Sequence, residues 1–240
     1  MRLAVCILHY GKSALTAKLH TQFLEADPTR NTDIFVLDNA ALEPYEGAWK
    51  RLDENLYWGG AFEWAAVAFS SAGYTHLWFC NNDITFVSPP PYFRRAEARI
   101  RWLEKQGRVG IYSPGATSNP YHSQMVARPG EECVKAMYVD GIAPVVSLEC
   151  FNALGGLDLD GNIYGYGVDV WLSYRAMKAG WGVWVDHTLV LRHKYHATAK
   201  DMPGFLSKAG ALEDRYMVER FGPEWRETLA AMQTMQERIQ

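Results

Sequence analysis

Residues 60–83 read GAFEWAAVAFSSAGYTHLWFCNND, and two kinds of element follow one another within them. The helical pattern of the first half predicts a helix over Gly60–Ala72. The short apolar run Thr75–Cys80 then predicts a strand, which ends at the polar cluster Asn81-Asn82-Asp83. A helix of this length that leads directly into an apolar strand is typical of a βαβ unit, so the stretch indicates an α/β protein with a mainly parallel sheet.

The same alternation occurs earlier in the chain. An apolar run at Arg2–Leu8 precedes a helical pattern at Ser13–Glu25, and a second apolar run covers Asp33–Leu37. These strands also end at polar residues, which are His9-Tyr10 and Asp38-Asn39. Ligands of parallel α/β sheets bind beyond the carboxyl ends of the strands, so we expect the three polar clusters to contribute to one binding site.

The second half of the chain mixes helices and strands after the break at Pro89-Pro90-Pro91. The segment Gly115–Glu132 is rich in Gly, Pro, Ser and Asn, and this composition predicts a mobile loop. No internal repeat or linker interrupts the pattern, so we expect a single domain over residues 1–240. The further predicted elements are a basic helix at 94–108, strands at Val109–Tyr112, Lys135–Val139, Ile142–Ser147, Val183–Val185 and Leu189–Leu191, helices at Leu148–Leu154 and Val168–Ala179, and a mostly helical tail at Glu213–Gln240.

The composition excludes several classes of protein. With 48% hydrophobic and 21% charged residues, the chain is expected to be globular rather than disordered. Its formal net charge of −3 argues against binding nucleic acid through overall charge, and no apolar run approaches the roughly 20 residues of a membrane span. The four cysteines form no CxxC pair, which predicts neither a zinc site nor a disulfide framework. We therefore expect a cytoplasmic protein, with peripheral association at a membrane as the alternative.

Asp83 is a candidate metal ligand. It lies two positions after Asn81 at a strand end, so one tight turn offers a carboxylate and an amide oxygen. Hard oxygen ligands suit Mg²⁺ or Mn²⁺, which bind one or two carboxylates together with substrate phosphates. The alternative is an Asx turn that only ends the strand.

His193 is a second candidate ligand, because an imidazole at a strand end can complete a metal shell. Lys194, His196 and Lys200 follow it and could offset the charge of a diphosphate leaving group. The alternative is a structural histidine with no role in binding.

Asp169 is a candidate general base. It lies in the run Tyr164-Gly165-Tyr166-Gly167-Val168-Asp169-Val170, at the first turn of a predicted helix. The helix dipole lowers the pKa of a carboxylate there, whereas partial burial raises it, and a carboxylate so placed can take a proton from a bound hydroxyl. The alternative is an acidic residue that serves only to stabilise the helix start.

Taken in order, these motifs resemble glycosyltransferase family 2, especially its rhamnosyltransferase-like branch, over about residues 3 to 196. The resemblance implies the GT-A fold, a mixed and mainly parallel central sheet flanked by helices. For the first half it implies that His9-Tyr10 and Asp38-Asn39 hold the nucleoside, and that the Asn-and-glycine segment before a helix, with Asn55 and Gly60, binds the donor. It also implies that Asn81 and Asn82 contact the donor and that Asp83 is the metal-binding carboxylate of a variant DxD motif. The residues that match this segment are Asn55 and Gly59-Gly60, and those of the variant motif are Asn81, Asn82 and Asp83.

The second half matches the same family more specifically. The runs Asp140-Gly141-Ile142-Ala143-Pro144 and Gly155-Gly156-Leu157-Asp158 resemble its acceptor-side segment. Asp169 aligns with the catalytic base of the ED motif, and His193 with a metal or diphosphate ligand. The chain departs from the family pattern at three positions, where it has Gly11, Asn81 and Val168.

The resemblance implies an inverting glycosyltransferase that uses a UDP-, GDP- or dTDP-sugar and a divalent cation, Mn²⁺ or Mg²⁺. Residues 1–88 would form the nucleotide-sugar-binding half, 109–196 the acceptor and catalytic half, and 197–240 a helical tail that packs on the core or forms a homodimer contact. A glycan or lipid-linked saccharide is the expected acceptor. A hydroxylated small molecule, a protein or a modified DNA base is the alternative, the last because of the basic helix at 94–108.

Two other functions stay open from the sequence. A sugar-phosphate nucleotidyltransferase also uses a nucleotide-binding α/β sheet. It needs a Gly-rich basic loop, however, and the segment Leu8–Lys12 matches such a loop only weakly. A non-catalytic module that binds sugar nucleotides or glycans would fit the missing first acidic residue of the DxD motif.

Overall fold

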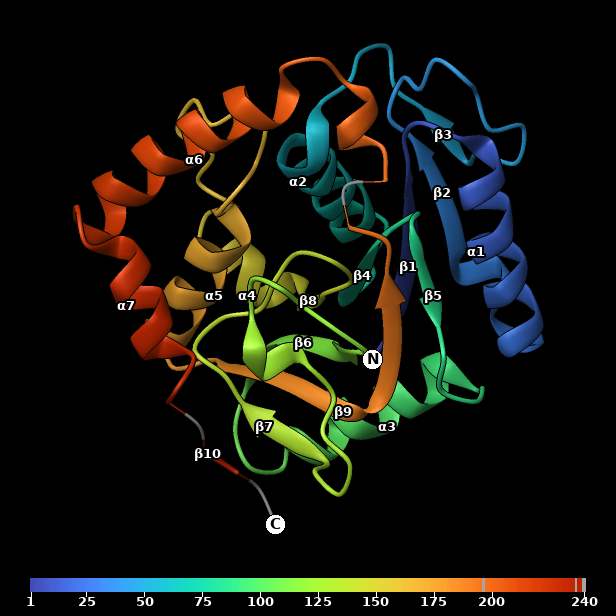
Figure 1. The fold of residues 1–240 in the computed structure, drawn as a ribbon. Coiled ribbons are helices and arrows are strands. Elements are labelled where there is room, and N and C mark those ends of the chain that lie inside the picture. Colours follow the sequence, from blue (N-terminus) through green and yellow to red (C-terminus); the bar gives the residue numbers. More distant parts are fainter. Residues whose placement is uncertain (196, 236, 239–240) are drawn as a thin grey trace.

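The strand β1 (Leu3–His9) lies third from one edge of a 10-stranded sheet in the computed structural model, which describes residues 1–195, 197–235 and 237–238 (Figure 1). Its neighbours β2 (Ile34–Asp38) and β4 (His76–Asn81) both run parallel to it. All residues of β1 are buried, because α1 (Ser13–Ala26) and α2 (Tyr57–Ser71) pack against this part of the sheet. The predicted alternation of strands and helices is therefore confirmed, with α2 beginning three residues earlier than predicted.

The rest of the sheet is mixed. From one edge to the other its order is β10-β7-β9-β6-β8-β4-β1-β2-β3, and β5 pairs antiparallel with β9 off this path. The remaining strands are β3 (Lys50–Arg51), β5 (Ile84–Phe86), β6 (Val109–Ala116), β7 (Cys133–Lys135), β8 (Val145–Ser147), β9 (Gly182–His193) and β10 (Glu237–Arg238). The remaining helices are α3 (Tyr92–Leu103), α4 (Leu148–Ala153), α5 (Val168–Lys178), α6 (Phe205–Phe221) and α7 (Trp225–Met232), with short 3₁₀ turns at Pro28–Asp33, Ser123–Met125 and Ala199–Asp201.

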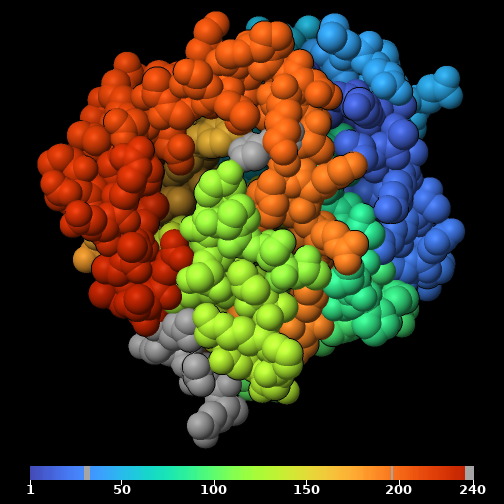
Figure 2. Space-filling view, viewed as in Figure 1, coloured from blue at the N-terminus to red at the C-terminus, as the bar shows by residue number. Residues whose placement is uncertain are grey.

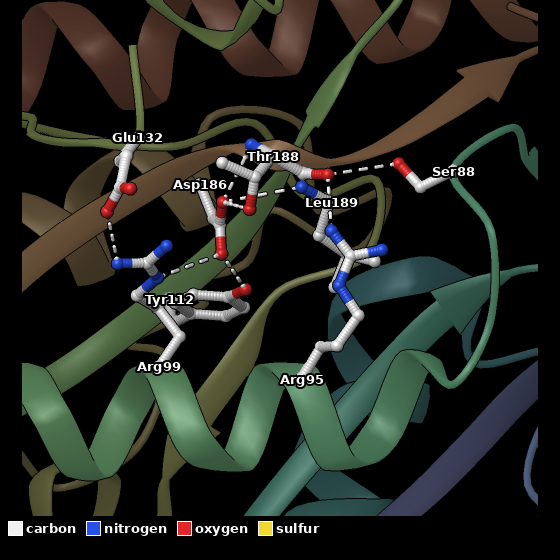
Figure 3. A network of polar contacts seen from close by, with 8 residues as sticks. All are labelled: Ser88, Arg95, Arg99, Tyr112, Glu132, Asp186, Thr188 and Leu189. Atoms are coloured by element: carbon white, nitrogen blue, oxygen red, sulfur yellow. Dashed lines mark hydrogen bonds and ion pairs between the residues drawn. The ribbon is translucent and has the colours of Figure 1, made fainter. Parts of the chain in front are cut away.

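The strand β9 bends where its register against β6 shifts, between the pairs Pro114–Asp186 and Gly115–Val190. Asp186, which is 2% exposed, accepts hydrogen bonds from the Thr188 amide and hydroxyl (2.8 and 2.7 Å) and from the Tyr112 hydroxyl (2.7 Å) (Figure 3). Arg99 Nε of α3 lies 3.6 Å from the same carboxylate. β9 thus pairs with β6 on both sides of the bulge, with β7 before it and with β5 after it.

Some predicted boundaries were wrong for physical reasons. The runs Val183–Val185 and Leu189–Leu191 belong to one strand, because the polar residues between them form the bulge that Asp186 caps. The segment Gly115–Glu132 is not wholly loop, since Gly115 and Ala116 end β6 and a 3₁₀ turn follows. The helical tail begins at Phe205 instead of Glu213, and its last described residues form β10.

The structure bears on two predicted kinds of partner, nucleic acid and membrane. The cations of the basic 94–108 segment mostly have protein partners: Arg95 donates to Thr188 O, Arg99 pairs with Glu132, and Arg108 pairs with Glu149. This weakens the interpretation of the segment as a nucleic-acid-binding face. Among the described residues, no helix combines the length and the apolar character that crossing a membrane requires.

Candidate functional site

A cavity of about 870 Å³ lies beyond the carboxyl ends of β1 and β4. Helices α6 and α7 form an arch over it from the C-terminal part of the chain, and Figure 2 shows the hollow between this orange and red arch and the green segment of the middle of the chain. Of the residues predicted for the site, the cavity is lined by Tyr10, Asn39, Asn55, Asn81, Asn82, Asp83, Asp169 and His193. The structure thus brings most of the predicted site residues together at one cavity.

Two predicted nucleoside-binding residues are absent from the cavity wall that the described residues form. His9 is fully buried, with Nδ1 2.7 Å from Thr16 Oγ1 and Nε2 2.7 Å from Glu43 O. Asp38 is also fully buried, and it accepts hydrogen bonds from the Ala41 amide (2.9 Å) and from Arg51 (2.6 Å). Both side chains bond to the loop that follows β2, so they stabilise that loop and do not line the cavity.

The pair Asn39 and Asn55 fixes the start of α2. Asn39 Nδ2 donates to Asn55 Oδ1 (2.8 Å), and Asn55 Oδ1 also accepts from the Tyr57 amide (2.8 Å). Tyr57 has φ +54°, a conformation that non-glycine residues rarely adopt, and these bonds hold it there with its side chain on the cavity wall.

In the Asn55–Gly60 segment, Gly59 is a position where a side chain would not fit. A Cβ on Gly59 would lie 2.7 Å from the Leu159 side chain, and one on Gly165 would lie 2.7 Å from the Gly59 nitrogen. The start of α2 and the segment before α5 therefore approach backbone to backbone. Gly60, which was predicted to bind the donor, lies in α2 and is not part of the described cavity wall.

Within the Asn81-Asn82-Asp83 cluster, each asparagine has one side-chain amide atom bonded to the protein. Asn81 Oδ1 accepts from Trp58 Nε1 (3.1 Å), and Asn82 Nδ2 donates to Thr16 Oγ1 (2.9 Å). Asp83 Oδ1 instead lies 3.0 Å from His193 Nε2. The register of β5 against β9 pairs Ile84 with His193, which explains why the two candidate ligands meet.

The Asp83–His193 pair fits a divalent cation. Two octahedral ligands at about 2.1 Å from Mg²⁺ and at right angles to each other are separated by about 3.0 Å, which matches the observed spacing. Nε2 is the imidazole nitrogen that faces Asp83, while Nδ1 is buried and has no hydrogen-bond partner among the described residues. No group of three metal-binding side chains occurs in the described part of the chain. A cation here would take its other ligands from substrate oxygens and water, as Mg²⁺ commonly does.

Asp169 also lines the cavity and lies in the first turn of α5. Its Oδ2 accepts a hydrogen bond from the Gly141 amide (2.6 Å), and its Oδ1 accepts one from the Val170 amide (2.9 Å). Burial and the neighbouring Asp140 carboxylate raise the pKa of Asp169 to about 7, against the lowering effect of the two amides. A carboxylate with this pKa is suited to accept a proton near neutral pH.

The sequence did not single out several groups that surround Asp169. Asp140 was seen only as part of an acceptor-side run, and Glu213 only as the start of a tail helix, yet both line the cavity. Burial raises the pKa of the Glu213 carboxyl as well. The aromatic rings that anchor the arch were also missed, such as Tyr57, which stacks on Phe205 of α6 at 5.9 Å. These residues come together only through the fold of the C-terminal part.

The basic side chains predicted to lie beside His193 do not line the described cavity wall. Lys194 and Lys200 are not among the residues that line the cavity, and His196 lies outside the described residues. Lys194 contributes through its backbone, because its amide donates to Asp83 O (3.0 Å).

Comparison with known proteins gives relatives and fold neighbours. No protein-family model matches the chain. The uncharacterized protein Rv1525 of Mycobacterium tuberculosis (strain ATCC 25618 / H37Rv) is 33% identical over 191 residues, which cover 75% of this chain and 71% of that protein. The uncharacterized protein Mb1552 of Mycobacterium bovis (strain ATCC BAA-935 / AF2122/97) matches to the same extent.

Two solved structures share the fold. GalNAc-T7, solved with UDP, GalNAc and Mn²⁺, superposes with a TM-score of 0.68 over 96% of this chain, at 13% identity. The mannosyltransferase PcManGT of Pyrobaculum calidifontis, in complex with GDP-Man and Mn²⁺, gives a TM-score of 0.56 at 16% identity, and the match covers 96% of this chain and 74% of that one. The chain spans half the length of the GalNAc-T7 chain. The predicted GT-A fold is thereby confirmed, whereas the assignment to the rhamnosyltransferase-like branch stays a prediction.

Proposed function

This chain belongs to the same protein family as the mycobacterial proteins Rv1525 and Mb1552, and we propose that it is a glycosyltransferase that moves a sugar from a nucleoside-diphosphate sugar to a hydroxyl group. One observation carries the proposal: Asp169, a carboxylate with a pKa of about 7, and the close pair Asp83 and His193 line a single cavity at the carboxyl edge of a GT-A sheet. The fold neighbours, which were solved with UDP or GDP-Man and with Mn²⁺, support it.

Asp83 and His193 would hold Mn²⁺ or Mg²⁺ together with the diphosphate of a UDP-, GDP- or dTDP-sugar. When bound, the cation supplies positive charge that stabilises the diphosphate as it leaves. Tyr10, Asn39 and Asn55 line the same part of the cavity and would contact the donor. In this assignment residues 1–88 form the donor half, and 109–196 form the acceptor half.

Asp169 would act as the general base of an inverting transfer. It accepts the proton of the acceptor hydroxyl while the hydroxyl oxygen forms a bond to the anomeric carbon of the donor sugar. The bond between that carbon and the diphosphate oxygen breaks, and its electron pair leaves with the diphosphate. The two amide hydrogen bonds orient the carboxylate for this step.

The two rival functions agree less well with the cavity. A nucleotidyltransferase must bind a triphosphate, but Arg226 is the only lysine or arginine among the described residues of the cavity wall, and it pairs with Asp214 at 2.9 Å. A binding module needs no base with a raised pKa beside the ligand. We therefore favour transfer to an acceptor, for which a glycan or lipid-linked saccharide is the proposed class in a cytoplasmic or membrane-peripheral setting.

A screen of sugar nucleotides tests the function. The protein is incubated with UDP-, GDP- and dTDP-sugars and with Mn²⁺ or Mg²⁺, and the release of nucleoside diphosphate is measured with and without a panel of glycosides. Glycoside-dependent release with one donor class supports the proposal. Pyrophosphate release from a nucleoside triphosphate and a sugar phosphate would instead show a nucleotidyltransferase, and binding without turnover would show a binding module.

A further inference from the structure

The side chain of Gln233, just after α7, uses all of its hydrogen-bonding capacity within the protein. Its Oε1 accepts from the Ser123 amide (3.0 Å) and hydroxyl (2.9 Å). Its Nε2 donates to Tyr121 O (3.0 Å) and to the Tyr138 hydroxyl oxygen (2.7 Å). An amide side chain has two donor hydrogens and two acceptor lone pairs, so nothing remains on Gln233 for a ligand.

The orientation of this amide is fixed by its partners. If oxygen and nitrogen were exchanged, Oε1 would face the carbonyl of Tyr121, and Nε2 would face the amide of Ser123. Both contacts would be repulsive, so only the observed orientation satisfies the backbone. Gln233 therefore donates to Tyr138, and the Tyr138 oxygen accepts.

The hydroxyl hydrogen of Tyr138 is consequently left over. Tyr138 is 3% exposed and lines the cavity, yet among the described residues its hydroxyl has no acceptor. A buried donor without an acceptor destabilises the protein unless a ligand or water supplies one. Burial, Asp169 and Asp140 raise the pKa of Tyr138 to about 12, against the lowering effect of the Gln233 amide, so the phenol keeps its proton at neutral pH.

We propose that Tyr138, oriented by Gln233, contacts the acceptor substrate by donating its hydroxyl hydrogen to an oxygen beside the hydroxyl that Asp169 deprotonates. The inference rests on the proposed glycosyltransferase function and makes it more specific, because the acceptor must carry a second oxygen near the reacting one. Tyr138 touches the substrate in this account, whereas Gln233 is a positioning residue that acts through Tyr138.

The test compares Tyr138→Phe with the wild-type protein on p-nitrophenyl glycosides, using the donor that gives turnover. Tyr138→Phe removes only the hydroxyl and keeps the ring that packs on His122 at 4.1 Å. We expect kcat/KM for the glycoside to fall about 10-fold, as for the loss of one hydrogen bond. The Kd of the nucleoside diphosphate with Mg²⁺ should stay unchanged, because the lost hydrogen bond is made to the acceptor.

Gln233→Leu should cause a similar loss, and the double variant with Tyr138→Phe should be no worse than either single variant, because both remove the same contact. Tyr216→Phe is the matched control: its hydroxyl donates to Asp158 O (2.9 Å) outside the cavity wall, so it should affect stability and leave kcat/KM unchanged.

Two results would overturn the inference: a Tyr138→Phe variant with wild-type kcat/KM for the glycoside, or one whose main defect is weaker binding of the nucleoside diphosphate. A wild-type protein that turns over no donor would instead remove the proposed function. In that case saturation-transfer NMR of the glycosides still tests Tyr138, and equal signals from the wild-type and Tyr138→Phe proteins would contradict the contact.

Discussion

His193 Nε2 lies 3.0 Å from Asp83 Oδ1, although one residue ends β9 and the other directly precedes β5. Their side chains are only 9% and 12% exposed, and both line the cavity. The antiparallel pairing of β5 with β9 fixes this contact, so the pair is a preformed part of the site.

Removing one member of this pair should weaken cation binding. We expect His193→Ala to lower the affinity for Mn²⁺ at least 10-fold in the presence of a nucleoside diphosphate, because no group of three metal-binding side chains occurs among the described residues, so each ligand matters. Titration followed by electron paramagnetic resonance measures this directly. His20→Ala is the control, since His20 bonds to the Tyr45 hydroxyl away from the cavity wall. Unchanged Mn²⁺ affinity in His193→Ala would show that His193 is not a ligand.

The rate of transfer should depend on the protonation of Asp169. Its pKa is raised to about 7, and a general base works only when deprotonated, so kcat/KM should rise with pH up to about 7 and then level off. The profile is measured with the glycoside acceptor between pH 5 and 9, and donor binding serves as the control. A rate that is already maximal at pH 5 would contradict this pKa.

The same pKa has a consequence for stability. The pKa of Asp169 is raised on folding from its ordinary 3.8, so the folded state binds the proton more tightly than the unfolded state and loses stability as pH rises from about 4 to about 7. The loss is on the order of 2–4 kcal/mol. Asp169→Asn lacks this titration, so its stability relative to wild type should increase over that range. Denaturant unfolding at pH 4 and pH 8 measures the difference, and a constant difference would argue against the raised pKa.

The bulge of β9 should matter for stability. Asp186→Ala would leave Arg99 and Tyr112 without their buried partner, so we expect a loss of about 3–5 kcal/mol in the free energy of unfolding. Glu132→Gln removes the exposed partner of Arg99 and should cost less than about 1 kcal/mol. If both variants lose the same stability, the network does not hold the bend.

The sequence was most informative where local pattern and fold agree. Apolar runs such as Thr75–Cys80 predicted buried strands, and the polar residues after them predicted the ligand-binding edge. The meeting of Asp83 with His193 followed from the family resemblance, and the register of β5 and β9 explains it.

Other features depend on partners that no local pattern reveals. Asp38 resembles a ligand-binding residue at a strand end, but the loop after β2 supplies the Ala41 amide and Arg51 that occupy it. The roles of Gln233 and Tyr138 arise from a contact between distant parts of the chain. Long-range contacts of this kind decide which polar side chains remain free for a ligand.

The central claim is tested most directly by one measurement on Asp169→Asn: glycoside-dependent release of nucleoside diphosphate from the donor that the wild-type protein uses. The account predicts a loss of at least about 100-fold in turnover, while the Kd of the nucleoside diphosphate with Mg²⁺ stays within about twofold of wild type. Full turnover by Asp169→Asn would contradict the assignment of the base.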